Sequence, residues 1–418
     1  MRKLGRVSFC VLLLFLAAAS LSILSGCGSS SSSPTASYVG TQSPGDYWTW
    51  AETTNSSGQV SFTAADVATG LTYSGSETAL SGNSSGITAL TVTSSTDPSI
   101  QSSLPAPAYE INVPNTMVMA AVPPFETVQQ PVAKMVSEQG PVVAAAQGSC
   151  PANGTTTNVD WIMMPRANWC PTASATFVPT DYQGNYTTCT AASDAYGTAS
   201  IAVDANGNYT LGVTAYYMNG TKDTSATAPV LSSCSCNSGV VQCTDNNNKP
   251  VKIAFTPSGI FIMDTANYGV AGVVQSNINA SGFYASGNAF KGMSFWSFDN
   301  PGPPAVPQQE YIPETAPASM TTNGTGMTFY TYANIDAGTL STSSTSVSFN
   351  NPTQVAPGLI TTTFTNCDSN SYPMAIALTN INGKYVAFAV GYSPGQGPGK
   401  GTTCPDYTHG FNVLAVQQ

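Results

Sequence analysis

This sequence has unusually few charged residues. Only 8% of its 418 residues are Asp, Glu, Lys or Arg, and there is a single histidine. Soluble domains usually carry about 25% charged residues, so a coiled coil or long helical bundle, which needs charged exposed faces, is excluded. The 11 Lys and Arg residues face 21 Asp and Glu residues, for a net charge of −10. This balance excludes a nucleic-acid-binding surface, because such surfaces need clustered basic residues.

Residues suited to catalysis are also scarce. Acid–base and nucleophilic chemistry usually needs His, Lys or paired carboxylates, and His409 lies in a predicted surface turn. Residues 82–86 match the GxSxG pattern, but a nucleophile elbow lies between a strand and a helix and this segment lies between two predicted strands. Glu110, Asp160, Asp264 and Asp299 are scattered acids, and two of them would have to face each other across a barrel to hydrolyse a glycoside. We therefore predict that the protein is not an enzyme.

The longest hydrophobic run is at the N-terminus. Three basic residues lie among the first six, and residues 7–24 are uncharged and mostly apolar, the layout of a secretory signal peptide. The next residues, Leu24-Ser25-Gly26-Cys27, resemble the lipobox of bacterial lipoprotein precursors. The resemblance implies cleavage before Cys27 and attachment of diacylglycerol and a further acyl chain such as palmitate, so that membrane lipid is a partner. An uncleaved membrane-spanning helix is the alternative.

The same resemblance predicts where the protein is located. Gly28 follows the cysteine, which in lipoproteins of this kind favours the outer membrane of the bacterial cell envelope; the surface and periplasmic faces both stay open. Residues 27–43 are then the lipidated cysteine and a Ser-rich flexible tether. Without residues 1–26 the chain keeps eight basic and 21 acidic residues. Such a negative surface is repelled by nucleic acid and by anionic lipid.

The cysteines agree with export. Cys10 leaves with the signal peptide and Cys27 takes the lipid, so eight remain, an even number that allows up to four disulfides in an oxidising compartment. The disulfide candidates are Cys150, Cys170, Cys189, Cys234, Cys236, Cys243, Cys367 and Cys404. We expect Cys367 to pair with Cys404, and Cys243 to pair with Cys234 or Cys236. No metal site and no cofactor are predicted, because the Cys-Ser-Cys spacing is not that of a zinc site and the only histidine is distant.

The body of the chain predicts β-strands nearly throughout. Short runs of alternating apolar residues are separated by turn residues, and glycine (37) and proline (29) are abundant. The one helix candidate is residues 131–139. We predict an all-β fold of tandem antiparallel β-meander units that close as small barrels or sandwiches, which limits exposed strand edges.

A weak internal repeat predicts the boundaries of these units. Three hairpin-like segments, residues 108–119, 250–263 and 373–388, resemble one another. Each is followed by a further apolar strand with a glutamine at or near its end, over residues 142–147, 270–275 and 411–417. The predicted units are residues 44–147, 148–275 and 276–418. Whether they are separate barrels or one continuous β structure stays open at this point.

Aromatic residues are the best sign of a binding site. Three pairs occupy alternate positions, which places both rings of a pair on one face of a strand. The pairs are Trp48 with Trp50, Trp296 with Phe298, and Tyr330 with Tyr332. Such rings stack on sugars or hold an apolar ligand; the alternative is core packing.

Together these features predict a non-catalytic, membrane-anchored envelope lipoprotein that binds a ligand or a surface partner. A glycan, a small apolar ligand or an envelope protein would each suit it. Two alternatives are a structural or assembly component of the envelope and a hydrolase of extracellular polymer. Beyond the lipobox, the mature region resembles exported bacterial proteins in general, and that resemblance implies no particular activity.

Overall fold

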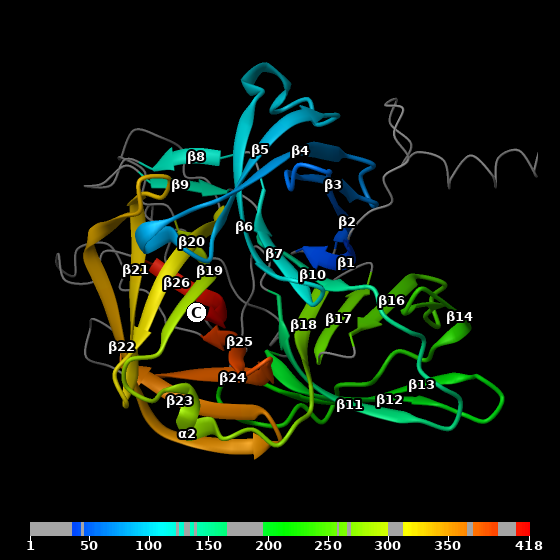
Figure 1. Cartoon of the computed structure of the whole chain (residues 1–418). Coiled ribbons are helices and arrows are strands. Elements are labelled where there is room, and N and C mark those ends of the chain that lie inside the picture. Colours follow the sequence, from blue (N-terminus) through cyan, green and yellow to red (C-terminus); the bar gives the residue numbers. More distant parts are fainter. Residues whose placement is uncertain are drawn as a thin grey trace, which may run out of the picture. The chain divides into compact units, whose positions relative to one another are not determined.

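The chain is nearly all β, as the sequence predicts. The structure, a computed structural model, describes residues 36–42, 46–122, 125–128, 134–137, 140–164, 195–256, 259–265, 269–299, 312–365, 371–391 and 407–418. In these residues the helices are one short α-helix, α2 (Ala280–Phe283), and two 3-10 turns, η1 (Gly82–Ser84) and η2 (Gln101–Ser103). No helix in the described residues is long and apolar enough to cross a membrane. Figure 1 shows the strands grouped into three sheets.

The first eight-stranded sheet closes on itself as the N-terminal barrel, in the order β1-β10-β7-β6-β5-β4-β3-β2. Its strands are β1 (Ala36–Gln42), β2 (Asp46–Thr54), β3 (Val60–Asp66), β4 (Thr72–Ala79), β5 (Thr88–Ser95), β6 (Ala106–Val113), β7 (Met117–Ala121) and β10 (Val142–Ala146). The predicted tether over 27–43 is therefore too long, since β1 begins at Ala36 and pairs with both β2 and β10. Tyr38 faces inward and is 1% exposed, so burial places this segment in the barrel.

The second sheet has eight strands and curls without closing, in the order β13-β12-β11-β18-β17-β16-β15-β14. Its strands are β11 (Thr156–Met163), β12 (Tyr196–Val203), β13 (Tyr209–Tyr216), β14 (Ser232–Asn237), β15 (Val240–Thr244), β16 (Pro250–Phe255), β17 (Ile260–Thr265) and β18 (Gly269–Val274). Residues from all eight strands pack together on one face of this curled sheet, among them Trp161, Ile201 and Phe261.

The third sheet forms the C-terminal barrel, in the order β19-β26-β25-β24-β23-β22-β21-β20, which a pairing of β19 with β20 closes. Its strands are β19 (Ala289–Asp299), β20 (Ile312–Thr322), β21 (Gly326–Asn334), β22 (Thr339–Ala356), β23 (Leu359–Thr365), β24 (Ser371–Ile381), β25 (Lys384–Gly391) and β26 (Tyr407–Gln417). Phe283 of α2 packs with the apolar residues that fill this barrel, such as Phe290 and Met320.

A hairpin of β8 (Phe125–Val128) and β9 (Lys134–Ser137) leaves the N-terminal unit and pairs with β20 of the C-terminal barrel. The helix prediction over residues 131–139 is wrong, because Lys134–Ser137 is a strand. One or two turns of helix are too short to be stable alone, whereas β9 gains a partner strand on each side. The hairpin also crosses the predicted boundary, since it lies in the 44–147 unit and joins the third sheet.

The three repeated segments are three-stranded meanders. Hairpin β6–β7 pairs onward with β10, β16–β17 with β18, and β24–β25 with β26. The β24–β25 turn is Asn382-Gly383, and both residues have positive φ, 53° and 84°. This is the two-residue turn that matches the right-handed twist of a hairpin, and glycine adopts it without strain.

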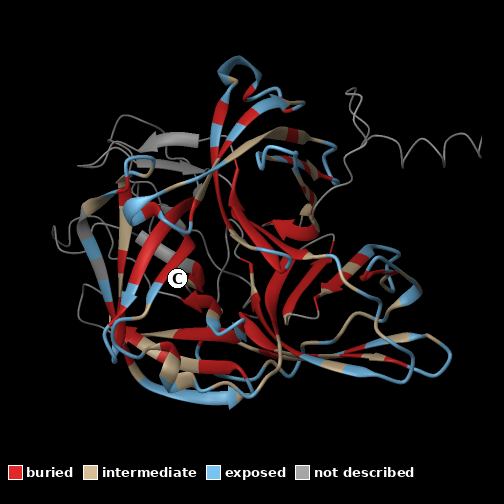
Figure 2. Ribbon diagram, in the orientation of Figure 1, coloured by how far each residue is buried: buried red, intermediate tan, exposed pale blue. Residues whose placement is uncertain are grey.

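These meanders are buried on both faces, and that decides how the sheets assemble. All five residues of β7 and all six of β17 are buried. One face of each meander lines its own barrel or curled sheet, and the other packs into a central core shared by all three. Central-core residues include Met119, Val143, Ile260, Val273, Phe388 and Leu414. Figure 2 shows buried residues concentrated in these inner strands, with exposed ones at the hairpin tips.

Phe388→Ala tests the central core. Phe388 is 0% exposed and belongs to the central core, whose members come from all three sheets, so truncation should lower the free energy of unfolding by about 3–5 kcal/mol. Urea unfolding followed by tryptophan fluorescence measures the loss. Val355→Ala is the control, since Val355 is 47% exposed and should change stability little. A loss at Phe388 no larger than at Val355 would contradict a shared core.

Candidate functional site

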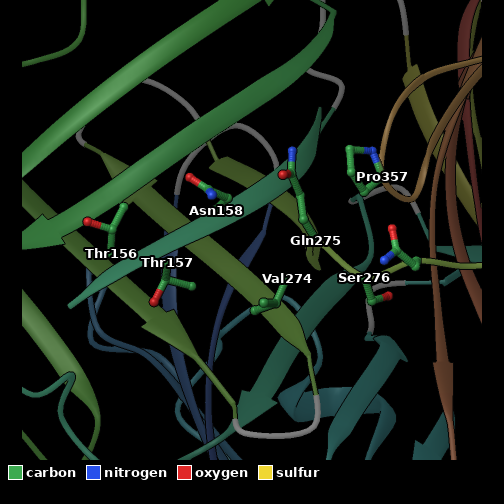
Figure 3. Close-up of a pocket in the computed structure, with 8 residues that line it drawn as sticks. Thr156, Thr157, Asn158, Val274, Gln275, Ser276 and Pro357 are labelled. Carbon is green, nitrogen blue, oxygen red and sulfur yellow. The ribbon is translucent and has the colours of Figure 1, made fainter.

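One pocket lies where the curled sheet meets the C-terminal barrel. It has a volume of about 500 Å³. Figure 3 shows the residues that line it, which come from the start of β11, the end of β18 and the turn between β22 and β23. They are Thr156, Thr157, Asn158, Val274, Gln275, Ser276, Asn277 and Pro357. Six of these eight side chains carry a neutral hydroxyl or amide group, so the wall offers hydrogen bonds without charge.

A buried carboxylate lies beside this pocket. Gln275 donates from Nε2 to Oδ1 of Asp160 at 2.7 Å. The other oxygen of Asp160 is buried without a protein donor, as is the hydroxyl of Ser276 in the pocket wall. Burial raises the pKa of Asp160 to about 7, although the Gln275 hydrogen bond acts in the lowering direction. The pocket therefore has polar atoms in and next to its wall that lack partners.

A cluster of three glutamates lies inside the N-terminal barrel. One carboxylate oxygen from each of Glu52, Glu77 and Glu110 lies within 4.8 Å of the other two. Asn112 donates from Nδ2 to Glu52 Oε1 at 2.6 Å. Glu110 is 0% exposed, and neither of its oxygens has a protein donor.

All three glutamates have raised pKa values, and the charge of Glu52 adds to the rise at Glu77. Burial is the main cause for all three, and it raises the pKa of Glu52 and of Glu77 to about 7. Burial and then the charges of Glu77 and Glu52 hold the pKa of Glu110 well above its ordinary value. An isolated buried carboxylate is costly, so this cluster needs either protons or a counter-charge.

The sequence alone predicts no such cluster, although Glu110 is one of its scattered acids. The signal that could have found it is the inward alternation of β2, where Trp48 and Trp50 are followed by Glu52. Glu77 and Glu110 continue similar inward series on β4 and β6. The residues are far apart in sequence, and only barrel closure brings them together.

The structure places the predicted aromatics at different sites. Trp48 and Trp50 are each 1% exposed and lie in the core of the N-terminal barrel. Their rings stack on Tyr73 and Phe62, with centroids 5.7 and 5.2 Å apart. Trp48 and Trp50 are therefore core residues, which was the alternative to ligand binding in the sequence analysis. A ligand outside the barrel cannot reach these rings.

Of the other two aromatic pairs, the structure describes the side chains of Tyr330 and Tyr332. Tyr332 is 6% exposed, and its hydroxyl donates to the backbone oxygen of Asn83 at 2.7 Å. Lys291 donates to the same hydroxyl at 2.9 Å, so Tyr332 ties the C-terminal barrel to the β4–β5 turn. Its neighbour Tyr330 is half-buried on β21. Trp296 and Phe298 lie on β19, but their side chains fall outside the described residues.

Two disulfides confirm the expectation of cystine bridges. Cys234 pairs with Cys243, one of the two predicted choices, and Cys236 pairs with Cys150. Both bridges tie the edge strand β14 to neighbouring segments. Four further candidates, Cys170, Cys189, Cys367 and Cys404, lie outside the described residues, as do Cys27 and the signal segment.

Three of the four acids considered for hydrolysis lie at separate places, and the side chain of the fourth, Asp299, lies outside the described residues. Glu110 lies inside the N-terminal barrel and Asp160 beside the pocket, while Asp264 accepts a hydrogen bond from Thr41 at 2.6 Å where β17 faces β1. In the GxSxG segment, Ser84 is buried in a 3-10 turn and donates to the backbone oxygen of Ile335 at 2.5 Å. Its hydroxyl is therefore committed to a structural contact.

Comparisons with known proteins identify no family for this chain. No family model and no curated protein matches the chain. Two solved structures of the vaccine antigen Transferrin Binding Protein B (TbpB) from Haemophilus parasuis Hp5, a single and a double mutant, are similar at 8% identity. They cover 92% of this chain and 77% and 76% of theirs, with TM-scores of 0.20 and 0.25. Similarity this low supports no conclusion about fold or function.

Asp160→Asn should make stability less sensitive to pH. Folded Asp160 keeps its proton up to about pH 7, whereas in the unfolded chain it loses it near 3.8. The wild-type protein therefore loses stability as pH rises through this window. The variant should be more stable than wild type by roughly 1–3 kcal/mol at pH 8 and gain little at pH 4. Urea unfolding at both pH values checks this. An equal difference at the two pH values would contradict it.

Proposed function

We propose that this chain is a lipoprotein of the bacterial cell envelope, anchored through Cys27, which binds a partner without catalysing a reaction. The observation that carries the proposal is the lipobox at Leu24-Ser25-Gly26-Cys27 directly after an apolar segment. The two disulfides support export, because such bonds persist in oxidising compartments. Diacylglycerol and a further acyl chain would hold the protein on the bilayer.

The short connection limits how far the barrel stands from the membrane. Only residues 28–35 separate Cys27 from the first strand, which begins at Ala36. A fully extended chain spans at most about 3.6 Å per residue, so Ala36 lies within about 30 Å of the anchor. The N-terminal barrel would therefore stand close to the lipid surface.

The pocket of Figure 3 is the proposed binding site. Its hydroxyl and amide groups suit a neutral ligand rich in hydroxyls, so of the partners considered we favour a glycan over a small apolar ligand. The unpartnered Ser276 hydroxyl would gain a hydrogen bond when such a ligand enters. The remaining lining groups would fix the orientation of the ligand.

Cys27→Ser tests the anchor. A serine cannot form the thioether, so we expect the variant to take up no labelled palmitate, to keep residues 1–26 and to be larger than the mature protein by mass. Cys10→Ser is the matched control, because Cys10 lies within the signal segment and should label normally. Palmitate labelling of the Cys27 variant would disprove the anchor.

Asn158→Ala tests the pocket. Wild-type protein is first screened on an array of bacterial and host glycans, and a retained glycan is then titrated by calorimetry. Losing one hydrogen bond should weaken binding about 3- to 10-fold. Asn246→Ala, on the exposed β15–β16 turn, is the control and should bind as wild type does. Retention of no glycan, or equal loss in both variants, would refute the glycan site.

A further inference from the structure

We propose that the carboxylate cluster at one end of the N-terminal barrel is a binding site for one divalent cation, Ca²⁺, held by Glu52, Glu77 and Glu110. Neither the lipid anchor nor the glycan pocket is needed for this site. The cation would be enclosed by the barrel wall and reached from one end of the barrel.

Strand direction brings the three carboxylates to one end. Neighbouring strands of the barrel are antiparallel, so the ends of β2, β4 and β6 lie together with the start of β1. Glu52 is two residues from the end of β2, Glu77 two from the end of β4, and Glu110 three from the end of β6. All three side chains follow the inward alternation of their strands, and Glu77 is the least buried of the three.

The spacing suits an ion. Ca²⁺ takes oxygen ligands at about 2.3–2.6 Å, so two ligands on opposite sides lie about 5 Å apart. The three carboxylate oxygens all lie within 4.8 Å of one another. A single ion between them can therefore contact all three with little movement of the side chains.

Unpartnered oxygens beyond the carboxylates supply independent support. The hydroxyl of Tyr38, a residue 1% exposed, makes no hydrogen bond of ordinary geometry, although Asn112 and Glu52 act on it as hydrogen-bonding groups, and the Oδ1 atom of Asn112 has no protein donor. The charges of Glu52 and Glu110 and the side chain of Asn112 all act on the Tyr38 hydroxyl, so it lies beside the cluster. Buried polar atoms nearly always have partners, and a bound cation would satisfy both oxygens.

The charge of the cluster is uncompensated by the protein. The charged groups that act on Glu77 and Glu110 are other glutamates, and in the described part of the chain no lysine acts on any of the three. Every candidate ligand atom is an oxygen, and oxygen-only sites select hard cations. Mg²⁺ keeps several of its waters and demands near-ideal octahedral geometry, so Ca²⁺ fits this enclosed site better.

Terbium luminescence tests the site. The full chain is purified from membranes in mild detergent and stripped with EDTA. Tb³⁺ replaces Ca²⁺ in oxygen sites and luminesces when a nearby tryptophan is excited, and Trp50 lies two residues from Glu52 on the same inward face. We expect luminescence that Ca²⁺ suppresses by competition and Mg²⁺ suppresses less, and a rise in Tm with added Ca²⁺.

Glu110→Gln should weaken Ca²⁺ binding at least tenfold in calorimetry and remove the luminescence. Should this variant not fold, Glu77→Gln, at the less buried position, replaces it and should show the same loss. Asp204→Asn is the control, since it also removes an acid but from the exposed β12–β13 turn of the curled sheet. The proposal fails if wild type shows neither luminescence nor a Tm rise with Ca²⁺, or if both signals persist in the glutamate variants. In either case the cluster holds protons instead of a metal.

Discussion

The central core is the contact on which the rest of the structure depends. Three meanders, one from each sheet, turn one face toward it, and each meander has its other face buried within its own sheet. Burying a large apolar side chain contributes about 1.5–3 kcal/mol, so the strands that are buried twice supply a large share of the stability. Their near-continuous apolar runs follow from this, whereas strands with one solvated face alternate.

The three sheets solve the problem of exposed edges differently. Both barrels close, so each of their eight strands is paired on both sides, and the edge of the third sheet is the added strand β8. The curled sheet does not close, and its edge strand β14 carries Cys234 and Cys236, whose disulfides tie it to β15 and to the segment before β11. The two disulfides therefore hold β14, which has a partner strand on one side only, against its neighbouring segments.

The two barrels differ inside. The C-terminal barrel is filled with apolar side chains such as Phe290, Ile376 and Leu378. The N-terminal barrel has stacked aromatics over most of its length and three glutamates at the end nearest Ala36. Buried charge without a partner opposes folding, so the glutamates would be removed by selection for stability alone. Asp160 beside the pocket is likewise a buried carboxylate with an unpartnered oxygen. The glutamate cluster and Asp160 are therefore two sites where buried side chains are ionisable groups instead of apolar ones.

The sequence by itself determined the fold class, most strand positions, the turns such as Asn382-Gly383, the repeated meanders and the choice of partners open to Cys243. These depend on alternation and turn chemistry, which act between residues close in the chain. Only the tertiary structure decided that β1 closes a barrel, that hairpin β8–β9 joins another sheet and that Trp48 and Trp50 are core residues. It also decided that the carboxylates of Glu52, Glu77 and Glu110 lie close together. Barrel closure and strand register bring together residues that are dozens of positions apart in the sequence, and no local sequence pattern encodes such a contact.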